Sequence, residues 1–395
     1  MKNGFAFPAA FLAVLLCMPP AARGQIDQTQ PVPALQTTAA ALRQGLDGSQ
    51  TGSPYPAATP GSLTLDVVVT DKSGAAVSGL QPADFKLFDN SQPQSIVSLR
   101  AVNGMKVKAD PPVEVILLVD AINPSALMVA DERQWLMEFF KENGGELALP
   151  TSLIMLTNQG MKVQDHPSRN GKALLEFLDA NATGLREIRR SEGLEGAVER
   201  EQASLNALDF LAAQEAGKPG RKLLIWVSTG WHLFSNPRWD GGPKDEQILF
   251  NYVVGLSTAL RAARITLYSV DPAGAGRGQF FYQNYLKCVD GPTHADYGAL
   301  MLQVAATQTG GQALSGNNDL AGLIDRCIKD AQNFYVLTFN PPPATHANEY
   351  HALRVEIAKP GLKARTRAGY YADPAVPETQ SFPTAALQTV QEVKE

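Results

Sequence analysis

A single carboxylate stands at the end of the most apolar stretch of the sequence. Residues 113–119 are nearly all apolar, which is typical of a strand buried on both faces, and Asp120 follows directly, with Asn123 and Ser125 close behind. Carboxylate, amide and hydroxyl oxygens are the ligands that Mg²⁺ and Ca²⁺ prefer. Asp120, Asn123 and Ser125 are therefore the candidate metal ligands. The alternative is that Asp120 and Asn123 accept hydrogen bonds from nearby backbone amides instead.

Two further patterns point to catalysis or nucleotide binding. Ser228 and His232 are close in sequence, but no Gly-x-Ser-x-Gly elbow accompanies them. Gly274, Gly276 and Gly278 follow a predicted strand, but they lack the spacing of a dinucleotide-binding loop and no helix opens directly after them. A hydrolase or nucleotide-binding enzyme with its site at the strand ends is the alternative function from a different class.

Aromatic and basic residues gather after two predicted strands. Arginine and aromatic side chains in exposed loops are typical of protein-interaction surfaces. The residues that we predict to contact a protein partner are Thr229, Trp231, Arg238, Trp239, Asp271, Arg277 and Phe280. The alternative is that the aromatic side chains pack locally as core.

The apolar periodicity predicts the elements that position these residues. Strands are expected at residues 113–119, 151–156, 222–227, 265–270 and 312–314, and helices around residues 131–140 and at 172–178, 193–216, 246–263, 297–308 and 320–331. Strands alternating with helices form a mainly parallel sheet covered on both faces. The fold class is therefore α/β, with residues 112–340 as the α/β domain. Asp120, Thr229 and Asp271 then lie at the carboxyl ends of strands, where such folds bind ligands.

The segments on either side of this domain have the period-two pattern of strands. Residues 61–108 form a predicted N-terminal β module, in which Leu63, Leu65 and Val67 alternate with polar positions. Residues 345–372 form a predicted C-terminal β hairpin around Pro360 and Gly361. We expect the two segments to pair into one small β-sandwich module beside the α/β domain.

The ends of the chain are expected to lie outside the folded domains. Residues 1–24 combine Lys2, an apolar run and a small-residue cleavage site, so they form a predicted signal peptide with cleavage after Gly24. An uncleaved anchor and a lipoprotein modified at Cys17 are alternatives. Residues 25–60 are expected to be a disordered linker and residues 373–395 a flexible tail. These features predict a secreted or periplasmic protein without a membrane span in its mature chain.

Composition excludes several classes of protein. Of the 395 residues, 44% are hydrophobic and 18% are charged, which excludes a disordered protein and a long coiled coil. The formal charge of −5 makes nucleic acid an unexpected partner. Cys288 and Cys327 are the two cysteines beyond residue 24. An oxidising compartment favours a disulfide between them, and two buried free thiols are the alternative.

The order of these motifs resembles a von Willebrand factor type A (VWFA) domain, and more closely the acidobacterial VWFA-related domain family. The likeness spans about residues 63–372. It is carried by residues 67–74, Asp84 and Phe85, the strand ending in Asp120, residues 152–156, 219–228 and 309–311, the strand at 334–341, and residues 353–371.

The resemblance implies a six-stranded Rossmann-like sheet whose rim holds a divalent cation that binds an acidic residue of a partner. Such a site needs Asp-x-Ser-x-Ser after the first strand and Asp-Gly after the fourth. Here Ile122 and Pro124 replace the two serines, and Thr229 precedes Gly230. We therefore expect a secreted, non-enzymatic, adhesion-type protein-interaction module with a degenerate metal-binding rim and no resident cofactor. The alternative within the family is a metal-dependent adhesion domain with Mg²⁺ or Ca²⁺ at Asp120.

Overall fold

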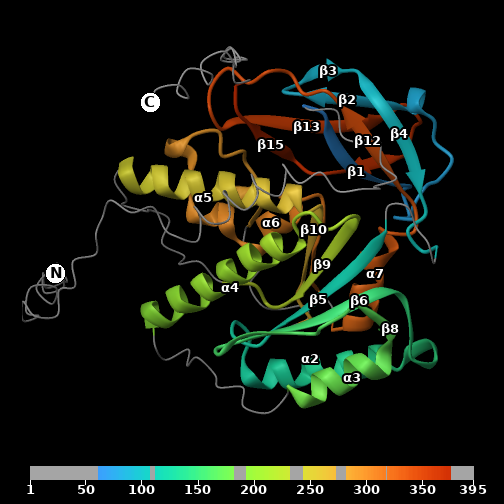
Figure 1. The fold of residues 1–395 in the computed structure, drawn as a ribbon, viewed down its shortest axis with the longest axis vertical. Helices are drawn as coiled ribbons and strands as arrows, with labels where there is room; N and C mark the ends of the chain where they lie inside the picture. Colours follow the sequence, from blue (N-terminus) through green and yellow to red (C-terminus); the bar gives the residue numbers. More distant parts are fainter. Residues whose placement is uncertain are drawn as a thin grey trace, which may run out of the picture.

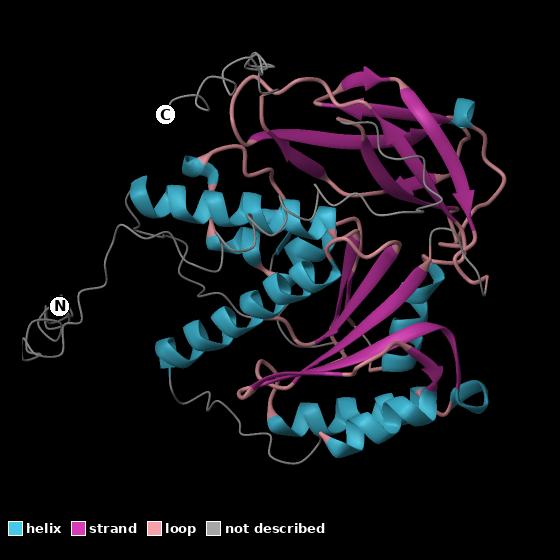
Figure 2. Ribbon diagram, in the orientation of Figure 1, coloured by secondary structure: helices cyan, strands magenta, loops and turns pink. Residues whose placement is uncertain are grey.

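The computed structural model describes residues 61–106, 112–181, 193–231, 243–272, 282–316 and 318–374. These residues form a mixed α/β structure with one mostly parallel sheet and two antiparallel sheets (Figure 1, Figure 2). The predicted signal peptide, the predicted linker and residues 375–395 of the predicted tail lie outside the described residues.

The mostly parallel sheet has the strand order β11-β10-β9-β5-β6-β7, and β8 also pairs with β6. Its parallel strands are β5 (Val113–Asp120), β6 (Glu146–Thr157), β9 (Arg221–Val227), β10 (Ile265–Val270) and β11 (Ala313–Leu314). Every residue of β9 and β10 is buried, as expected for strands covered on both faces. The edge strands β7 (Gly160–Val163) and β8 (Ser168–Asn170) run antiparallel to β6 and were not predicted from the sequence.

Helices cover both faces of this sheet (Figure 1). One face packs against α2 (Ala126–Phe139), α3 (Gly171–Ala180) and α7 (Leu320–Lys329). The other packs against α4 (Gly193–Glu215), α5 (Pro243–Ala262) and α6 (Leu302–Gln308). Successive residues of a strand point to opposite faces, so Leu117 joins the first core and Leu118 the second. None of the described helices combines the length and the apolar composition needed to cross a bilayer.

The two antiparallel sheets form a β-sandwich from both ends of the chain. One has the order β14-β1-β12-β4 and the other β15-β13-β2-β3. The strands are β1 (Leu63–Thr70), β2 (Phe85–Asp89), β3 (Gln92–Gln94), β4 (Ile96–Val102), β12 (Phe334–Phe339), β13 (Glu349–Ile357), β14 (Lys363–Arg365) and β15 (Gly369–Ala372). Leu65 and Val67 of the first sheet share a core with Leu87 and Val355 of the second. The expected pairing of the N-terminal and C-terminal segments is therefore present.

Two predicted boundaries need correction. Strand β12 lies between β1 and β4 in the sandwich, so the α/β domain ends with α7 rather than at residue 340. Residues 345–372 are not a simple hairpin. Strand β13 pairs with β15 in one sheet, whereas β14 pairs with β1 in the other, because the chain changes sheets between Arg365 and Gly369.

The α/β domain is inserted between two neighbouring strands of the sandwich. Val102 at the end of β4 pairs with Phe334 at the start of β12. The amide of Gly104 donates a hydrogen bond of 2.9 Å to the carbonyl oxygen of Ala331. A Cβ atom on Gly104 would lie 2.6 Å from that oxygen, so this close approach requires glycine. The chain thus leaves and rejoins the sandwich at one place.

Candidate functional site

The candidate site lies at the carboxyl ends of β5 and β9. We call the carboxyl ends of β5, β9 and β10 the rim. From β5 the chain proceeds to β6 on one side, and from β9 it proceeds to β10 on the other. In open α/β sheets the ligand crevice lies where the strand order reverses in this way. Asp120 ends β5, Ser228 and Thr229 follow β9, and Asp271 follows β10. The topology therefore brings Asp120 to the same edge of the sheet as residues that follow it by more than a hundred positions in the sequence.

The carboxylate of Asp120 is completely buried and accepts five hydrogen bonds. Its Oδ1 accepts from the backbone amides of Ile122 and Asn123, each at 3.0 Å. Its Oδ2 accepts from Nδ2 of Asn123 at 2.7 Å, from Oγ of Ser228 at 2.8 Å and from Nε1 of Trp226 at 3.1 Å. A carboxylate offers about four lone-pair positions, so the donors of the protein itself occupy this one.

The other two predicted ligands also have structural partners. Nδ2 of Asn123 donates to Oγ of Ser204 on α4 at 2.9 Å as well as to Asp120, so this side chain ties a helix to the rim. Oγ of Ser125 accepts from the amide of Met128 at 3.3 Å and caps the N-terminus of α2. The Nδ2 group of Asn123 and the hydroxyl of Ser125 are thus engaged within the protein itself, as the carboxylate of Asp120 is.

The residues at the rim do not fit a bound Mg²⁺ or Ca²⁺. A hard cation requires about six oxygens with free lone pairs facing one point. Ile122 is a buried aliphatic residue, and both oxygens of Asp120 already accept hydrogen bonds. Within the described part of the chain, no cluster of three or more His, Cys, Asp or Glu residues is arranged to hold a metal ion.

Two residues predicted to contact a partner are buried. Trp231 is 1% exposed, packs edge-to-face on Trp226 with ring centroids 5.0 Å apart, and donates from Nε1 to the carbonyl oxygen of Leu300 at 2.9 Å. Thr229 is 6% exposed. For Trp231 the structure corresponds to the alternative of local packing, because a largely apolar indole gains more from the core than from water.

The remaining predicted contact residues have different outcomes. Asp271 is partly exposed, and its amide continues the pairing of β10 by donating to the carbonyl oxygen of Leu314 at 2.8 Å. Arg238, Trp239, Arg277 and Phe280 lie outside the described residues.

The residues of the enzyme alternative divide in the same way. Ser228 is completely buried, its hydroxyl donates to Asp120, and its Oγ accepts from the amide of Gly230 at 3.0 Å. A nucleophilic hydroxyl must reach substrate and a neighbouring base, and this hydroxyl is committed to a carboxylate inside the protein. His232 and Gly276 lie outside the described residues.

The predicted disulfide is absent from the structure. Both cysteines are free thiols: Cys288 is exposed, whereas Cys327 on α7 is buried in the core beneath the sheet. Burial raises the pKa of the Cys327 thiol well above its ordinary value. Two sulfur atoms in such different environments do not form the short, specific geometry of a disulfide.

A buried glutamate near the rim was missed in the sequence. Glu132 on α2 is completely buried, and neither of its carboxyl oxygens has a hydrogen-bond partner. Burial, followed by the negative charge of Asp120, raises its pKa well above the ordinary value. Its spacing from Val129 and Leu136 places it on the apolar face of the helix. A charged residue between two apolar positions of the same helix face is the signal in the sequence that indicates this buried group.

An exposed apolar segment lies next to the buried network. Ala126 and Leu127, at the start of α2, are exposed, and Leu127 is 75% exposed. They follow directly on Ser125, the N-cap residue. Among the described residues, Leu127 is the most exposed of the large hydrophobic side chains. The rim therefore combines a polar network that is closed to solvent with an aliphatic side chain that is open to it.

No protein-family model matches this chain, and no curated protein sequence matches it either.

Proposed function

We propose that the chain is a secreted, non-enzymatic protein-interaction module of the VWFA-related kind. The motif order of the sequence resembles that family over residues 63–372. Numbered from β5 in chain order, with β8 omitted, the strands of the central sheet stand in the order 3-2-1-4-5-6, which is that of a Rossmann-like sheet. Secretion is supported by the signal-like pattern of residues 1–24.

The hydrogen bonds of Asp120 are the observation that carries the proposal. An adhesion rim that works through a cation needs a carboxylate with free lone pairs, and Asp120 uses its oxygens to join β5, β9 and the loop before α2. The carboxylate thus acts as a structural acceptor, and the rim binds a partner without a cation.

The start of α2 is the contact point that the described residues favour. A leucine that is 75% exposed leaves most of its apolar surface in water, and covering that surface with a partner is favourable by roughly 25 cal/mol per Å². Leu127 lies two residues after Ser125, the N-cap residue of α2, and so belongs to the segment that directly follows the Asp120 loop.

A cross-linking experiment on envelope extracts tests this proposal. The chain carrying Leu127→Asp is compared with the wild type and with Val97→Asp, a matched change at a 59% exposed apolar residue of β4 in the sandwich. We expect one discrete cross-linked product for the wild type and the Val97 variant, and at least about a tenfold loss for the Leu127 variant. The yield should not change with EDTA.

Other results would favour the alternatives. Loss of the product in EDTA, with recovery in Mg²⁺, would support metal-dependent adhesion. Equal loss in both variants, or in neither, would remove the start of α2 as the contact point. Turnover of an ester or a nucleotide that Ser228→Ala abolishes would replace the proposal by the enzyme alternative.

A further inference from the structure

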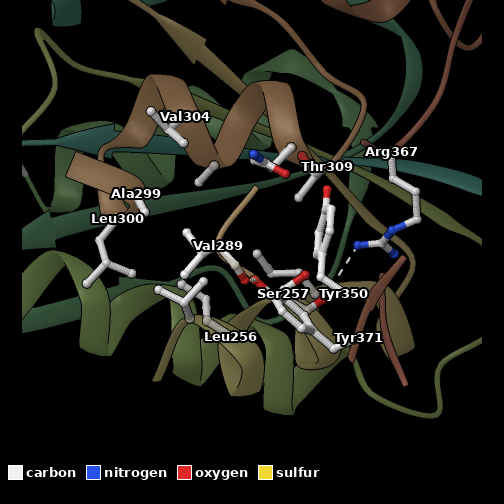
Figure 3. Close-up of a pocket in the computed structure, with 14 residues that line it drawn as sticks. Leu256, Ser257, Val289, Ala299, Leu300, Val304, Thr309, Tyr350, Arg367 and Tyr371 are labelled. Atoms are coloured by element: carbon white, nitrogen blue, oxygen red, sulfur yellow. Dashed lines mark hydrogen bonds between the residues drawn. The ribbon is translucent and has the colours of Figure 1, made fainter. Parts of the chain in front are cut away.

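Three neighbouring cavities share lining residues where the β-sandwich packs against the α/β domain. The smallest, of about 30 Å³, lies between β1, the first residues of β9 and β10, the end of α5, and the segment that links β14 to β15. It shares Arg367 with an apolar cavity of about 50 Å³, shown in Figure 3, and Arg261 with a more open groove of about 340 Å³. This junction is at the amino ends of β9 and β10, at the opposite end of the sheet from the rim.

The smallest cavity is strongly positive. Four guanidinium groups line it, those of Arg221, Arg261, Arg264 and Arg367, and they face a single carboxylate, that of Asp66. A short ion pair of 2.5 Å already joins Asp66 to Arg264. The carboxylate is therefore committed to one cation, and the lining carries an excess of three positive charges.

Arg221 is stabilised in a different way. It is 1% exposed, its Nη1 donates to the carbonyl oxygen of Asp330 at 3.0 Å, and its guanidinium stacks on Phe334 at 4.7 Å from the ring centroid. Such stacking on an aromatic face offsets part of the cost of burying a cation. Among the described residues, Arg261 and Arg367 have neither an ion pair like that of Arg264 nor a stacking contact like that of Arg221.

Arg261 and Arg367 make no ion pair with a described carboxylate, although the charge of Asp66 acts on Arg367. The buried Nε of Arg261 has no hydrogen-bond acceptor within the described part of the chain. Arg367 donates from Nε to the carbonyl oxygen of Gly369 at 3.0 Å, and from Nη2 only weakly, to that of Ser257 at 3.5 Å (Figure 3). Burial lowers the pKa of both side chains; for Arg367, burial and the charge of Arg261 lower it to about 9. Two cations held together in this way favour an anion beside them.

We propose that the junction is a carboxylate-binding site, in which Arg261 and Arg367 hold the carboxylate of a small organic acid. The planar fork of a guanidinium matches the two oxygens of a carboxylate. Tyr370 and Tyr371, together with Leu63, line the larger groove beside Arg261 and receive the apolar body of the acid. Ligand sites occur preferentially at such domain junctions.

The size of the polar cavity favours a carboxylate over a phosphate. A cavity needs a volume of about 10–15 Å³ to hold one water molecule. The polar cavity of about 30 Å³ therefore holds two oxygen-sized groups. That is the requirement of the two carboxylate oxygens, whereas a phosphate brings four. The hydroxyl of Thr366 is engaged with the carbonyl oxygen of Asp66 at 2.9 Å, so the arginines supply the donors for the ligand.

Titration of the purified chain with sodium acetate and sodium hexanoate tests the site. The measurements are the thermal midpoint and the heat of binding, in Tris chloride at constant ionic strength, with sodium phosphate and extra chloride as comparison anions. The variant is Arg261→Gln, and the matched control is Arg326→Gln, at an exposed arginine of α7. The Arg261 variant should have a thermal midpoint equal to or above that of the wild type in anion-poor buffer, because it loses a partly buried charge that makes no ion pair.

We expect saturable binding of both acids, tighter for hexanoate, to the wild type and to the control, with an affinity at least about tenfold weaker in the Arg261 variant. Equal shifts in all three proteins would show a general salt effect and would overturn the site. Absence of binding to the folded wild type would overturn it as well. Phosphate binding that exceeds hexanoate binding and requires Arg261 would keep an anion site but overturn its assignment to carboxylates. None of these outcomes depends on the protein-interaction function of the rim.

Discussion

Asp120→Asn distinguishes a structural carboxylate from a metal ligand. The substitution keeps the shape and one oxygen, which remains able to accept from the amides of Ile122 and Asn123. It replaces the other oxygen by an NH₂ group that faces Nδ2 of Asn123 and Nε1 of Trp226, both of which are donors. The hydroxyl of Ser228 can rotate to accept, so two buried donors lose their acceptor.

The expected loss of stability follows from these two donors. A buried donor without an acceptor costs about 1–3 kcal/mol, so the variant should lose about 2–6 kcal/mol of unfolding free energy. The assay is urea unfolding in buffer with EDTA, followed by tryptophan fluorescence, to which Trp226 and Trp231 in this network contribute. The matched control is Asp179→Asn, at a 57% exposed ion-pair residue, which should change stability by less than about 1 kcal/mol.

One pair of results would refute this reasoning. In that case Asp120→Asn is as stable as the wild type in EDTA, while Mg²⁺ raises the thermal midpoint of the wild type by several degrees and leaves the variant unchanged. Asp120 would then be a metal ligand rather than a structural hydrogen-bond acceptor.

Two more measurements test buried groups of the α/β domain. Because burial raises the folded-state pKa of Glu132 above the ordinary 4.5, the folded chain holds a proton that the unfolded chain releases, and stability falls as pH rises from 4.5 towards the raised pKa. Glu132→Gln removes that titration. The free energy of unfolding of the variant, measured in urea, should therefore rise relative to that of the wild type by about 1.4 kcal/mol per pH unit in this window. A difference between the two proteins that stays constant from pH 5 to pH 7 would contradict the raised pKa of Glu132. In a chain that carries Cys17→Ser, Cys288 should react with a thiol reagent in the native state and Cys327 only after unfolding. Native labelling that survives a further Cys288→Ser change would contradict the buried position of Cys327.

The fold was predictable from the sequence where the apolar periodicity is strong. It was not predictable at short edge strands and at the boundaries between elements. Residues 222–227 and 265–270 are apolar because both faces are covered, and they form β9 and β10. Strand β7 has four residues and β8 only three, both at the edge of the sheet, so neither has enough alternation to be recognised. The break of the expected helix at 297–308 depends on Met301, which takes an extended conformation between a 3-10 turn and α6.

The candidate site was predictable only in its local part. The alternative in which Asp120 accepts from nearby amides depends on residues two and three positions further on, and short Asx turns can be read from sequence. The bonds from Trp226 and Ser228 join residues 106 and 108 positions apart, which requires the strand order. The arginine cluster is still harder to predict from the sequence, since Arg261 and Arg367 come from different domains and no spacing rule connects them.

The insertion of the α/β domain has a mechanical consequence. The described chain begins at β1 and ends after β15, both in the sandwich, while the inserted domain departs from β4 and returns to β12 through adjacent positions held by the Gly104 to Ala331 hydrogen bond. A pulling force applied to the two ends would first load the ladders of the two terminal strands, which join β1 to β12 and β14, and β15 to β13. The force would not pass through the inserted domain, so its rim and core would keep their geometry until β4 and β12 separate.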